Sequence, residues 1–250
     1  KSNVTRGIPR LKELLHISGN IKSPSATIYL KDNLKNDRNK ALYIKNNLEY
    51  TLIKDIITTS SIYYDPNNNI HETILNDDKE MLSIYKEFLD IENADIETYD
   101  WILRFVFDKE KMMEKNIVMD DVYYALMNYD ADKLIFTFSD DNSKQLIGRV
   151  SMKITNSNML STNNGIQDQS DIISIFKNIN EDILNNISIR GIKGITDIIC
   201  TEVKQSVKKD KETIMENQYI LETDGTNLLE ILNNEYIDHI HTISNDIIEV

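Results

Sequence analysis

The sequence predicts an α+β fold in which mainly antiparallel sheets pack against helices. Segments with helical spacing of apolar residues are interspersed with strand segments, without the strict βαβ rhythm of a parallel sheet. Residues 101–108, WILRFVFD, alternate large apolar side chains and place Arg104 on the opposite face, which is typical of a strand in an antiparallel sheet. Residues 134–138 and 146–154 flank the polar turn SDDNSK and predict a β-hairpin.

The other elements are predicted from the spacing of their apolar residues. Gly7 and Pro9 form a turn before a helix expected at residues 10–17. An apolar stripe should bury this helix; it consists of Leu11, Leu14 and Leu15. Further helices are expected at residues 37–53, 77–89, 119–127, 172–183 and 228–232. Further strands are expected at residues 25–31, 56–64, 195–204, 218–222 and 240–248. The segments 156–169 and 205–217 should be loops.

Composition and charge limit the function. The chain has 250 residues, of which 40% are hydrophobic, so it can build a packed core. The formal net charge of −13 is opposite to that of a protein that grips DNA over its whole surface, so a nucleic acid could be met only through a local patch. The single cysteine excludes an intramolecular disulfide and a cysteine-rich zinc site, and it fits a reducing compartment. No apolar run approaches the roughly 18 residues of a membrane span.

The most metal-like pattern is the pair His239 and His241, with Glu235 nearby. The two histidines would share one face of a strand, and with Glu235 they could serve a small metal-dependent hydrolase. A zinc site needs three or four ligands at defined spacing, and only the pair of histidines in this pattern suggests such ligands. Surface histidines are therefore the favoured interpretation.

Two other patterns are weaker still. Cys200 lies in an apolar alternation and is better explained as a small buried hydrophobic residue than as a nucleophile. Glu222 and Asp224 flank a threonine just before Gly225, which could suggest acid–base chemistry but is also an ordinary turn. The chain contains neither GxxxxGK[ST] nor GxGxxG, so no phosphate-binding glycine loop is predicted.

Blocks along the whole chain resemble, in order, the segment after the trigger loop in the largest subunit of RNA polymerase II-like DNA-directed RNA polymerases. The blocks are NVTRGIPRLKELLHISGNIKSPSATIYL (3–30), EYTLIKDIITTSSIYYDP (49–66), WILRFVFDKEKMMEKNIVMDDV (101–122), LIFTFSDDNSKQLIGRV (134–150), NISIRGIKGI (186–195), YILETDGTNLLEIL (219–232) and HIHTISNDIIEV (239–250). The sequence departs from the family at His16, Ile17 and Gly19 and in the two segments expected to be loops.

The resemblance implies a jaw module inserted in a trigger-loop-base module. Residues 1–55 and 186–250 would form the base of the trigger loop on the cleft side, beside the secondary channel, and residues 56–185 would form the jaw. The family holds its catalytic Mg²⁺ in an Asn-Ala-Asp-Phe-Asp-Gly-Asp loop, which this sequence lacks. The chain is therefore expected to belong to a nucleotidyltransferase while carrying no catalytic residue, no metal ligand and no cofactor of its own.

The expected roles of individual residues are positioning and contact. Gly7 and Pro9, with Arg6 and Arg10, would anchor the trigger loop and border the nucleotide channel. Contacts with downstream DNA or the nucleotide channel would fall to three basic residues of the jaw, Arg104, Lys109 and Lys111.

The resemblance also implies partners. These are the rest of the largest subunit, the other polymerase subunits including a small zinc-bearing subunit at the jaw, downstream duplex DNA and a transcript-cleavage factor. The compartment would be the nucleus, or the host cytoplasm or virion for a large DNA virus. The alternative is a free-standing acidic interaction module that shares the jaw fold.

Overall fold

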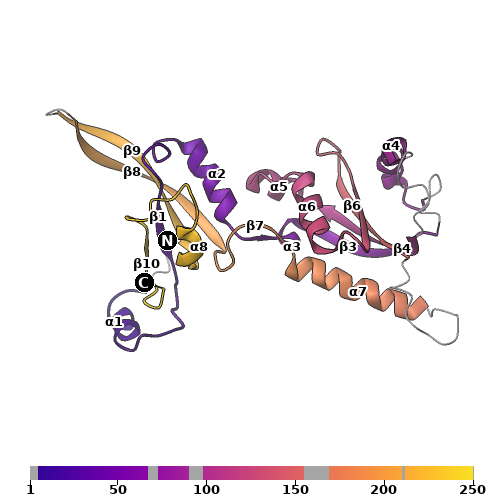
Figure 1. The fold of residues 1–250 in the computed structure, drawn as a ribbon, viewed down its shortest axis with the longest axis horizontal. Coiled ribbons are helices and arrows are strands. Elements are labelled where there is room, and N and C mark those ends of the chain that lie inside the picture. The colour runs from indigo at the N-terminus through magenta and orange to yellow at the C-terminus, as the bar shows by residue number, and fades with distance from the viewer. Residues whose placement is uncertain (1–4, 67–72, 90–97, 155–168, 210–211, 250) are drawn as a thin grey trace. The chain divides into compact units, whose positions relative to one another are not determined.

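A computed structural model describes residues 5–66, 73–89, 98–154, 169–209 and 212–249. The chain divides into two compact units, unit 1 with residues 1–51 and 190–250 and unit 2 with residues 52–189 (Figure 1). Every named strand pair with an assigned register is antiparallel, and helices pack on the sheets, so the predicted α+β fold is confirmed. The roles expected of the two modules stay predictions.

Unit 1 is built on a four-stranded sheet in the order β10-β1-β9-β8. Its strands are β1 (Ala26–Tyr29), β8 (Asp197–Lys209), β9 (Glu212–Asp224) and β10 (Ile243–Ser244). Asp37 directly precedes helix α2 (Arg38–Leu48) and caps it, because its carboxylate accepts from two backbone N–H groups of the first turn. Its buried residues, Ala41, Ile44 and Leu48, form one core with the sheet residues Ile28, Ile198 and Leu221. Two short helices complete the unit, α1 (Ile8–Leu15) and α8 (Leu228–Leu232).

Two predictions for unit 1 are wrong. The charged segment 205–217 is largely strand, because the β8–β9 pairing continues from Asp197 opposite Asp224 to Lys209 opposite Glu212. The strand expected at residues 240–248 is reduced to two residues. Asp238 starts a turn instead, since its carboxylate accepts from Ile240 N and its carbonyl oxygen accepts from Thr242 N.

The expected burial of the first helix is also wrong within this chain. Helix α1 forms close to the predicted place, but none of its residues is buried. Its apolar side chains are exposed: Ile8 70%, Leu11 55%, Leu14 43% and Leu15 73%. The apolar spacing indicates that one face of the helix is suited to burial, and it does not specify what covers that face.

Unit 2 is built on a four-stranded sheet in the order β3-β4-β6-β5. The strands are β3 (Ile57–Tyr64), β4 (Thr98–Phe107), β5 (Leu134–Phe138) and β6 (Leu146–Lys153). Its helical elements are α3 (Ile53–Ile56), η1 (Asn76–Asp78), α4 (Lys79–Leu89), α5 (Lys109–Lys115), α6 (Met119–Asp130) and α7 (Gln169–Asn186). The short strands β2 (Thr51–Leu52) and β7 (Ser188–Arg190) form a two-stranded sheet.

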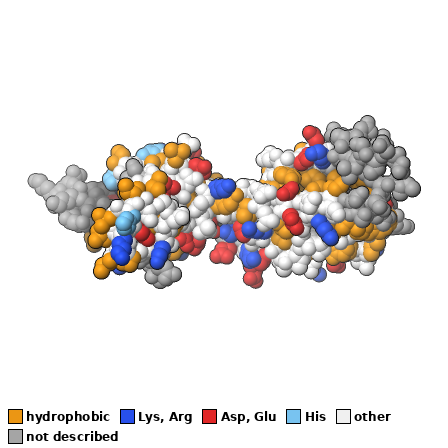
Figure 2. All heavy atoms as spheres, turned by 90° about the horizontal axis from the view of Figure 1, so that it is seen from below, with side chains coloured by type: hydrophobic (Ala, Val, Ile, Leu, Met, Phe, Trp, Pro, Cys, Tyr) orange, Lys and Arg blue, Asp and Glu red, His pale blue; other side chains and the backbone are white. Residues whose placement is uncertain are grey.

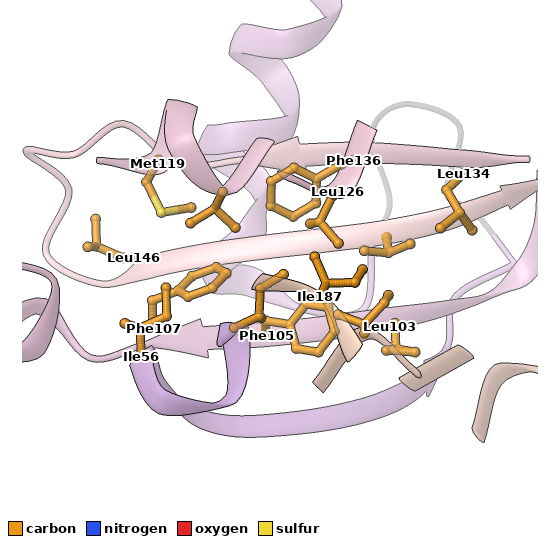
Figure 3. Packing of buried hydrophobic residues seen from close by; sticks show 14 of the residues in the cluster. Ile56, Leu103, Phe105, Phe107, Met119, Leu126, Leu134, Phe136, Leu146 and Ile187 are labelled. Atoms are coloured by element: carbon orange, nitrogen blue, oxygen red, sulfur yellow. The ribbon is translucent and has the colours of Figure 1, made fainter. Parts of the chain in front are cut away.

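One face of the unit 2 sheet carries the core. The predicted alternation in β4 is confirmed, because Leu103, Phe105 and Phe107 are all buried (Figure 3). They form one cluster with residues of α6 and α7, among them Val122, Leu126, Phe176 and Ile183. Gly148 lies directly opposite Phe105, and a Cβ there would approach the Phe136 ring to 2.7 Å, so this position needs glycine for packing.

Candidate functional sites

The N-terminal turn has the geometry that the sequence predicts. Gly7 adopts φ 69° and ψ −141°, a conformation that is essentially restricted to glycine. Its carbonyl oxygen accepts from Leu11 N at 3.0 Å, and Pro9 lies in the first helical turn. A Cβ on Gly7 would meet nothing within 4 Å, so the need for glycine here comes from the backbone alone.

The two arginines beside this turn have different surroundings. The guanidinium of Arg10 contacts Glu13 Oε2 at 3.1 Å and also donates to the carbonyl oxygen of Asn245, which ties α1 to the segment after β10. A second tie joins Thr5 N to Ser23 Oγ at 3.0 Å. Arg6 is exposed. The structure therefore fixes Arg10 within unit 1 and presents Arg6 to solvent.

The three basic residues expected to contact DNA also differ in their surroundings. Lys109 and Lys111 are exposed on α5, where Lys109 Nζ donates to Ser143 O at 3.3 Å and Lys111 Nζ lies 3.8 Å from Asp108 Oδ2. Arg104 instead contacts Asp78 Oδ1 through its NH2 group at 2.9 Å, and its side chain is only 11% exposed. The charge of Arg104 is thus used inside the fold.

A buried ion-pair network surrounds Arg104 on the face of the sheet away from the core. Arg104 on β4 and Arg149 on β6 are directly opposite in the strand register. Like charges in this arrangement repel each other. Asp78 contacts both guanidinium groups, because its Oδ2 also lies 3.1 Å from Arg149 NH1, and its side chain is fully buried.

Asp65 and Thr73 complete this network. Arg149 NH2 lies 2.9 Å from Asp65 Oδ2, and the side chains of both residues are 1% exposed. The same oxygen accepts from Thr73 Oγ1 at 2.6 Å, and Thr73 Oγ1 accepts from Arg149 NH1 at 3.2 Å. Among the described residues, Asp65 Oδ1 is buried without a hydrogen-bond partner. The network therefore ties the end of β3 and the start of α4 to the centre of the sheet.

Sequence reasoning missed this network. The acidic first turn of residues 77–89 suits a helix dipole, but Asp78 lies in η1 and contacts the two arginines instead. A charged residue such as Arg104 within an apolar strand signals that a buried partner is needed. The sequence does not say which of the 41 acidic residues supplies it.

The histidine pattern does not form a metal site. His239 and His241 lie in a turn rather than a strand, so the expected common face is absent. His241 Nδ1 lies 2.6 Å from Asp238 Oδ2, and this hydrogen bond lowers the pKa of Asp238. Within the described ranges, no three His, Cys, Asp or Glu side chains could together hold a metal ion. The metal-dependent hydrolase thus finds no support in the geometry.

The remaining sequence candidates have structural surroundings. Cys200 is partly buried, and burial raises the pKa of its thiol, while Arg38 and Lys45 oppose the shift. Thr223 Oγ1 accepts from Ala26 N at 2.8 Å, which ties the stretch between Glu222 and Asp224 to β1. These surroundings favour the interpretation of Cys200 as a small hydrophobic residue and of Glu222 and Asp224 as part of an ordinary turn.

The described residues include no helix that is long and apolar enough to cross a membrane. Of the segment 156–169, all but the last residue lies outside the described residues, as do residues 210–211 at the end of the β8–β9 ribbon.

The comparison with known families gives the identity. Residues 51–190, more than half of the chain, match the family described as RNA polymerase Rpb1, domain 7. This range nearly coincides with unit 2, so the family match and the division of the fold agree. The chain belongs to the RNA polymerase Rpb1 domain 7 family and is a segment of the largest subunit of an RNA polymerase.

Proposed function

We propose that this segment is the non-catalytic jaw of the polymerase together with the anchor of its trigger loop. Unit 2 is the jaw, which guides downstream duplex DNA, and unit 1 holds the trigger-loop base beside the secondary channel. The observation that carries the proposal is the family match over residues 51–190, a range that nearly coincides with one compact unit of the fold. The Mg²⁺ of the polymerase is held by another part of the enzyme.

The DNA contact is assigned to Lys109 and Lys111. Both are exposed on one short helix, and their contacts with Ser143 O and Asp108 are long and solvent-exposed, so both ammonium groups can turn to a phosphate at little cost. Arg104 is left out of this contact because Asp78 already binds it. Phosphate contacts of this kind position the duplex without reading its sequence.

The DNA contact is tested by the salt dependence of binding. In the assembled polymerase, the double substitution Lys109→Gln and Lys111→Gln should lower the slope of log K against log salt by about 1.8, or about 0.9 for each lost phosphate contact. The matched control removes two other exposed lysines of unit 2, Lys133 and Lys177. An equal change in slope for both double variants would disprove the assignment.

The anchoring role rests on the turn before α1. Gly7 has a backbone conformation that other residues avoid, and Pro9 fixes φ in the next helical turn, so the chain direction at this point is strongly constrained. Such a turn is suited to the place where a mobile loop returns to rigid structure. Arg10 strengthens it through Glu13 and the Asn245 carbonyl oxygen.

The anchoring role is tested by elongation and pausing. Pro9→Gly frees φ at the first helical turn and should change both the elongation rate and the pausing of the full polymerase. Lys22→Gly, at an exposed position after α1, is the control for flexibility added outside the turn. If the Pro9→Gly enzyme elongates and pauses like the unmodified enzyme, the anchor hypothesis is wrong.

The proposed partner subunits would meet the sheet of unit 2 at its edges. In unit 2 the edge strands of the described sheet are β3 and β5, and a small zinc-bearing subunit can add a strand to such an edge. A transcript-cleavage factor would approach the same region. The alternative of a free-standing acidic module is decided by the coding sequence that precedes residue 1, because a trigger loop there excludes it.

A further inference from the structure

The segment that carries α1 is closed into a loop by hydrogen bonds between its two ends. Thr5 N donates to Ser23 Oγ at 3.0 Å, and the two hydroxyl oxygens of these residues lie 3.1 Å apart. No residue of α1 is buried, so apolar packing within the described chain does little to hold the loop of residues 5–25. Figure 2 shows hydrophobic side chains beside Lys, Arg and His side chains at the left of the view, where unit 1 lies. The attachment of this loop therefore depends on hydrogen bonds.

Asn245, the residue directly after β10, holds the returning end of the loop. Its backbone N–H donates to Ser25 O at 3.0 Å, which continues the pairing of Ala26 with Ser244 by one residue. Its side-chain Oδ1 accepts from Ser25 N at 2.8 Å, and its Nδ2 donates to Ser23 O at 2.9 Å. Asn245 therefore satisfies three backbone groups of residues 23–25.

The same residue also contacts α1. The carbonyl oxygen of Asn245 accepts from the guanidinium group of Arg10, which is also bonded to Glu13. Ser23, whose carbonyl oxygen accepts from the Asn245 amide, holds Thr5 through its hydroxyl group. The helix and both ends of the loop are thus connected through one residue.

The hydrogen-bond pattern at this point requires an amide side chain. Ser25 N–H can only donate and Ser23 C=O can only accept, so these two groups fix which end of the amide carries the oxygen. Aspartate would supply the acceptor without the donor, and alanine would supply neither. Gly225 N donates to Pro24 O at 3.0 Å, so a second part of unit 1 also holds the segment between them.

We propose that Asn245 is a positioning residue for the trigger loop. It acts by fixing the loop of residues 5–25, and with it the turn at Gly7 and Pro9, and this inference rests on the proposed anchoring function of that turn. A mobile catalytic loop that closes over its substrate needs a fixed point of attachment. Loosening Asn245 therefore slows the step that requires closure and leaves the binding of the nucleotide unchanged.

The attachment is tested by hydrogen exchange and mass spectrometry on the assembled polymerase. Asn245→Ala removes both side-chain hydrogen bonds and should raise the exchange of residues 5–17 about tenfold, because each such bond contributes a few-fold to the opening equilibrium. Asn245→Asp keeps the side-chain volume and should also raise this exchange, because the donor to Ser23 O is lost. Strand β1, where Ala26 N donates to Thr223 Oγ1 at 2.8 Å, should exchange as in the unmodified enzyme.

The matched control is Asn227→Ala. Asn227 is a half-buried asparagine of unit 1 whose side chain also forms two hydrogen bonds, accepting from Glu230 N at 3.3 Å and donating to Lys193 O at 3.0 Å. This control should leave the exchange of residues 5–17 unchanged. An equal rise in both alanine variants would overturn the assignment to Asn245, because it would reflect a general loosening of unit 1.

The functional readout is single-nucleotide addition by the same polymerases. Asn245→Ala should lower kcat and kcat/KM together, about threefold, with KM unchanged, which is the signature of an interaction needed only in the closed state. Asn227→Ala should alter neither constant. A rise in KM with kcat unchanged would overturn the inference, since it would place the effect on nucleotide binding.

The comparison with Pro9→Gly separates this inference from the anchor itself. If Pro9→Gly alters nucleotide addition and neither Asn245 variant does, the anchor stands and the role of Asn245 is overturned. Unchanged exchange of residues 5–17 in both Asn245 variants also overturns it. If exchange rises in Asn245→Ala and neither this variant nor Pro9→Gly alters nucleotide addition, the anchor hypothesis fails, and the positioning role fails with it.

Discussion

Arg149 is the residue whose loss the structure predicts to be most damaging. It is the largest of the side chains that are almost fully buried, and its guanidinium contacts Asp65, Asp78 and Thr73. Arg149→Met keeps much of the side-chain volume and removes the charge. Asp78 then retains Arg104, whereas the Asp65 carboxylate loses its cation and keeps the hydrogen bond from the hydroxyl group of Thr73.

The magnitude follows from the buried carboxylate that is left behind. Removing one partner of a buried ion pair costs about 3–5 kcal/mol, because the other charge stays desolvated. We expect the upper part of this range, since Asp65 Oδ1 is already buried without a partner. At about 3 °C for each kcal/mol in a unit of this size, a cost of about 4–5 kcal/mol corresponds to a fall of about 12–15 °C in the melting temperature of unit 2.

The assay is urea unfolding of the full chain, followed by tryptophan fluorescence. Trp101 is the single tryptophan and lies on β4 in unit 2, where its ring is 5.1 Å from that of Tyr64, so its emission reports on this unit. The control is Lys133→Met, which breaks an ion pair of the same 2.9 Å length at an exposed position and should change little.

A double-mutant cycle separates the charge from the packing. Asp65→Asn in the Arg149→Met background removes the unpaired charge and should show a coupling of about 1–3 kcal/mol. If Arg149→Met costs less than about 1 kcal/mol, or if the cycle shows no coupling, then the network does not stabilise unit 2 as a set of buried charges.

Three further predictions concern single positions. Gly148→Ala should destabilise unit 2 by about 1–3 kcal/mol in the same urea assay, because the new methyl group overlaps the Phe136 ring; Gly19→Ala, where a Cβ would meet only Ile248 at 3.5 Å, is the control. The Cys200 thiol, whose pKa burial raises, should react with an aromatic disulfide more slowly than free cysteine, and urea unfolding should remove the difference. The hydrogen bond with His241 lowers the pKa of the Asp238 carboxyl group, so its stabilisation should be present above the ordinary pKa of 3.8 and lost as the pH falls below that value. His241→Gln should therefore raise the pKa of Asp238 in an NMR titration, and an unchanged titration would contradict the contact.

The sequence predicts the elements that have a clear period. The helix at residues 119–127 and the strand at 101–108 are found as α6 and β4, and the hairpin at 134–154 is found as β5 and β6. In each of these, the periodic apolar residues are the ones that enter the core. The spacing of apolar residues therefore predicts correctly which residues are buried, where the elements that cover them belong to the same unit.

The elements that the sequence does not predict lack a clear period of apolar residues. Helix α5, with the sequence KEKMMEK, buries only Met112, so the spacing alone gives no period to detect. The outer part of the β8–β9 ribbon pairs through its backbone while its residues are charged, and composition therefore suggests a loop. The apolar spacing of α1 predicts a buried face, but amphipathicity shows only that a covering partner is needed and does not identify that partner.

The buried network shows why site predictions need the fold. Arg104 and Arg149 are 45 positions apart in sequence (149 − 104), and only the strand register brings them opposite each other. The negative charge that makes this arrangement stable comes from Asp78 and Asp65, which lie outside the segment that pairs them. The network itself is thus electrically balanced, with two positive and two negative groups, and the charge of Arg104 is compensated within it. The proposed DNA contact therefore rests on Lys109 and Lys111 of α5, whose contacts with Ser143 O and Asp108 are long and exposed to solvent.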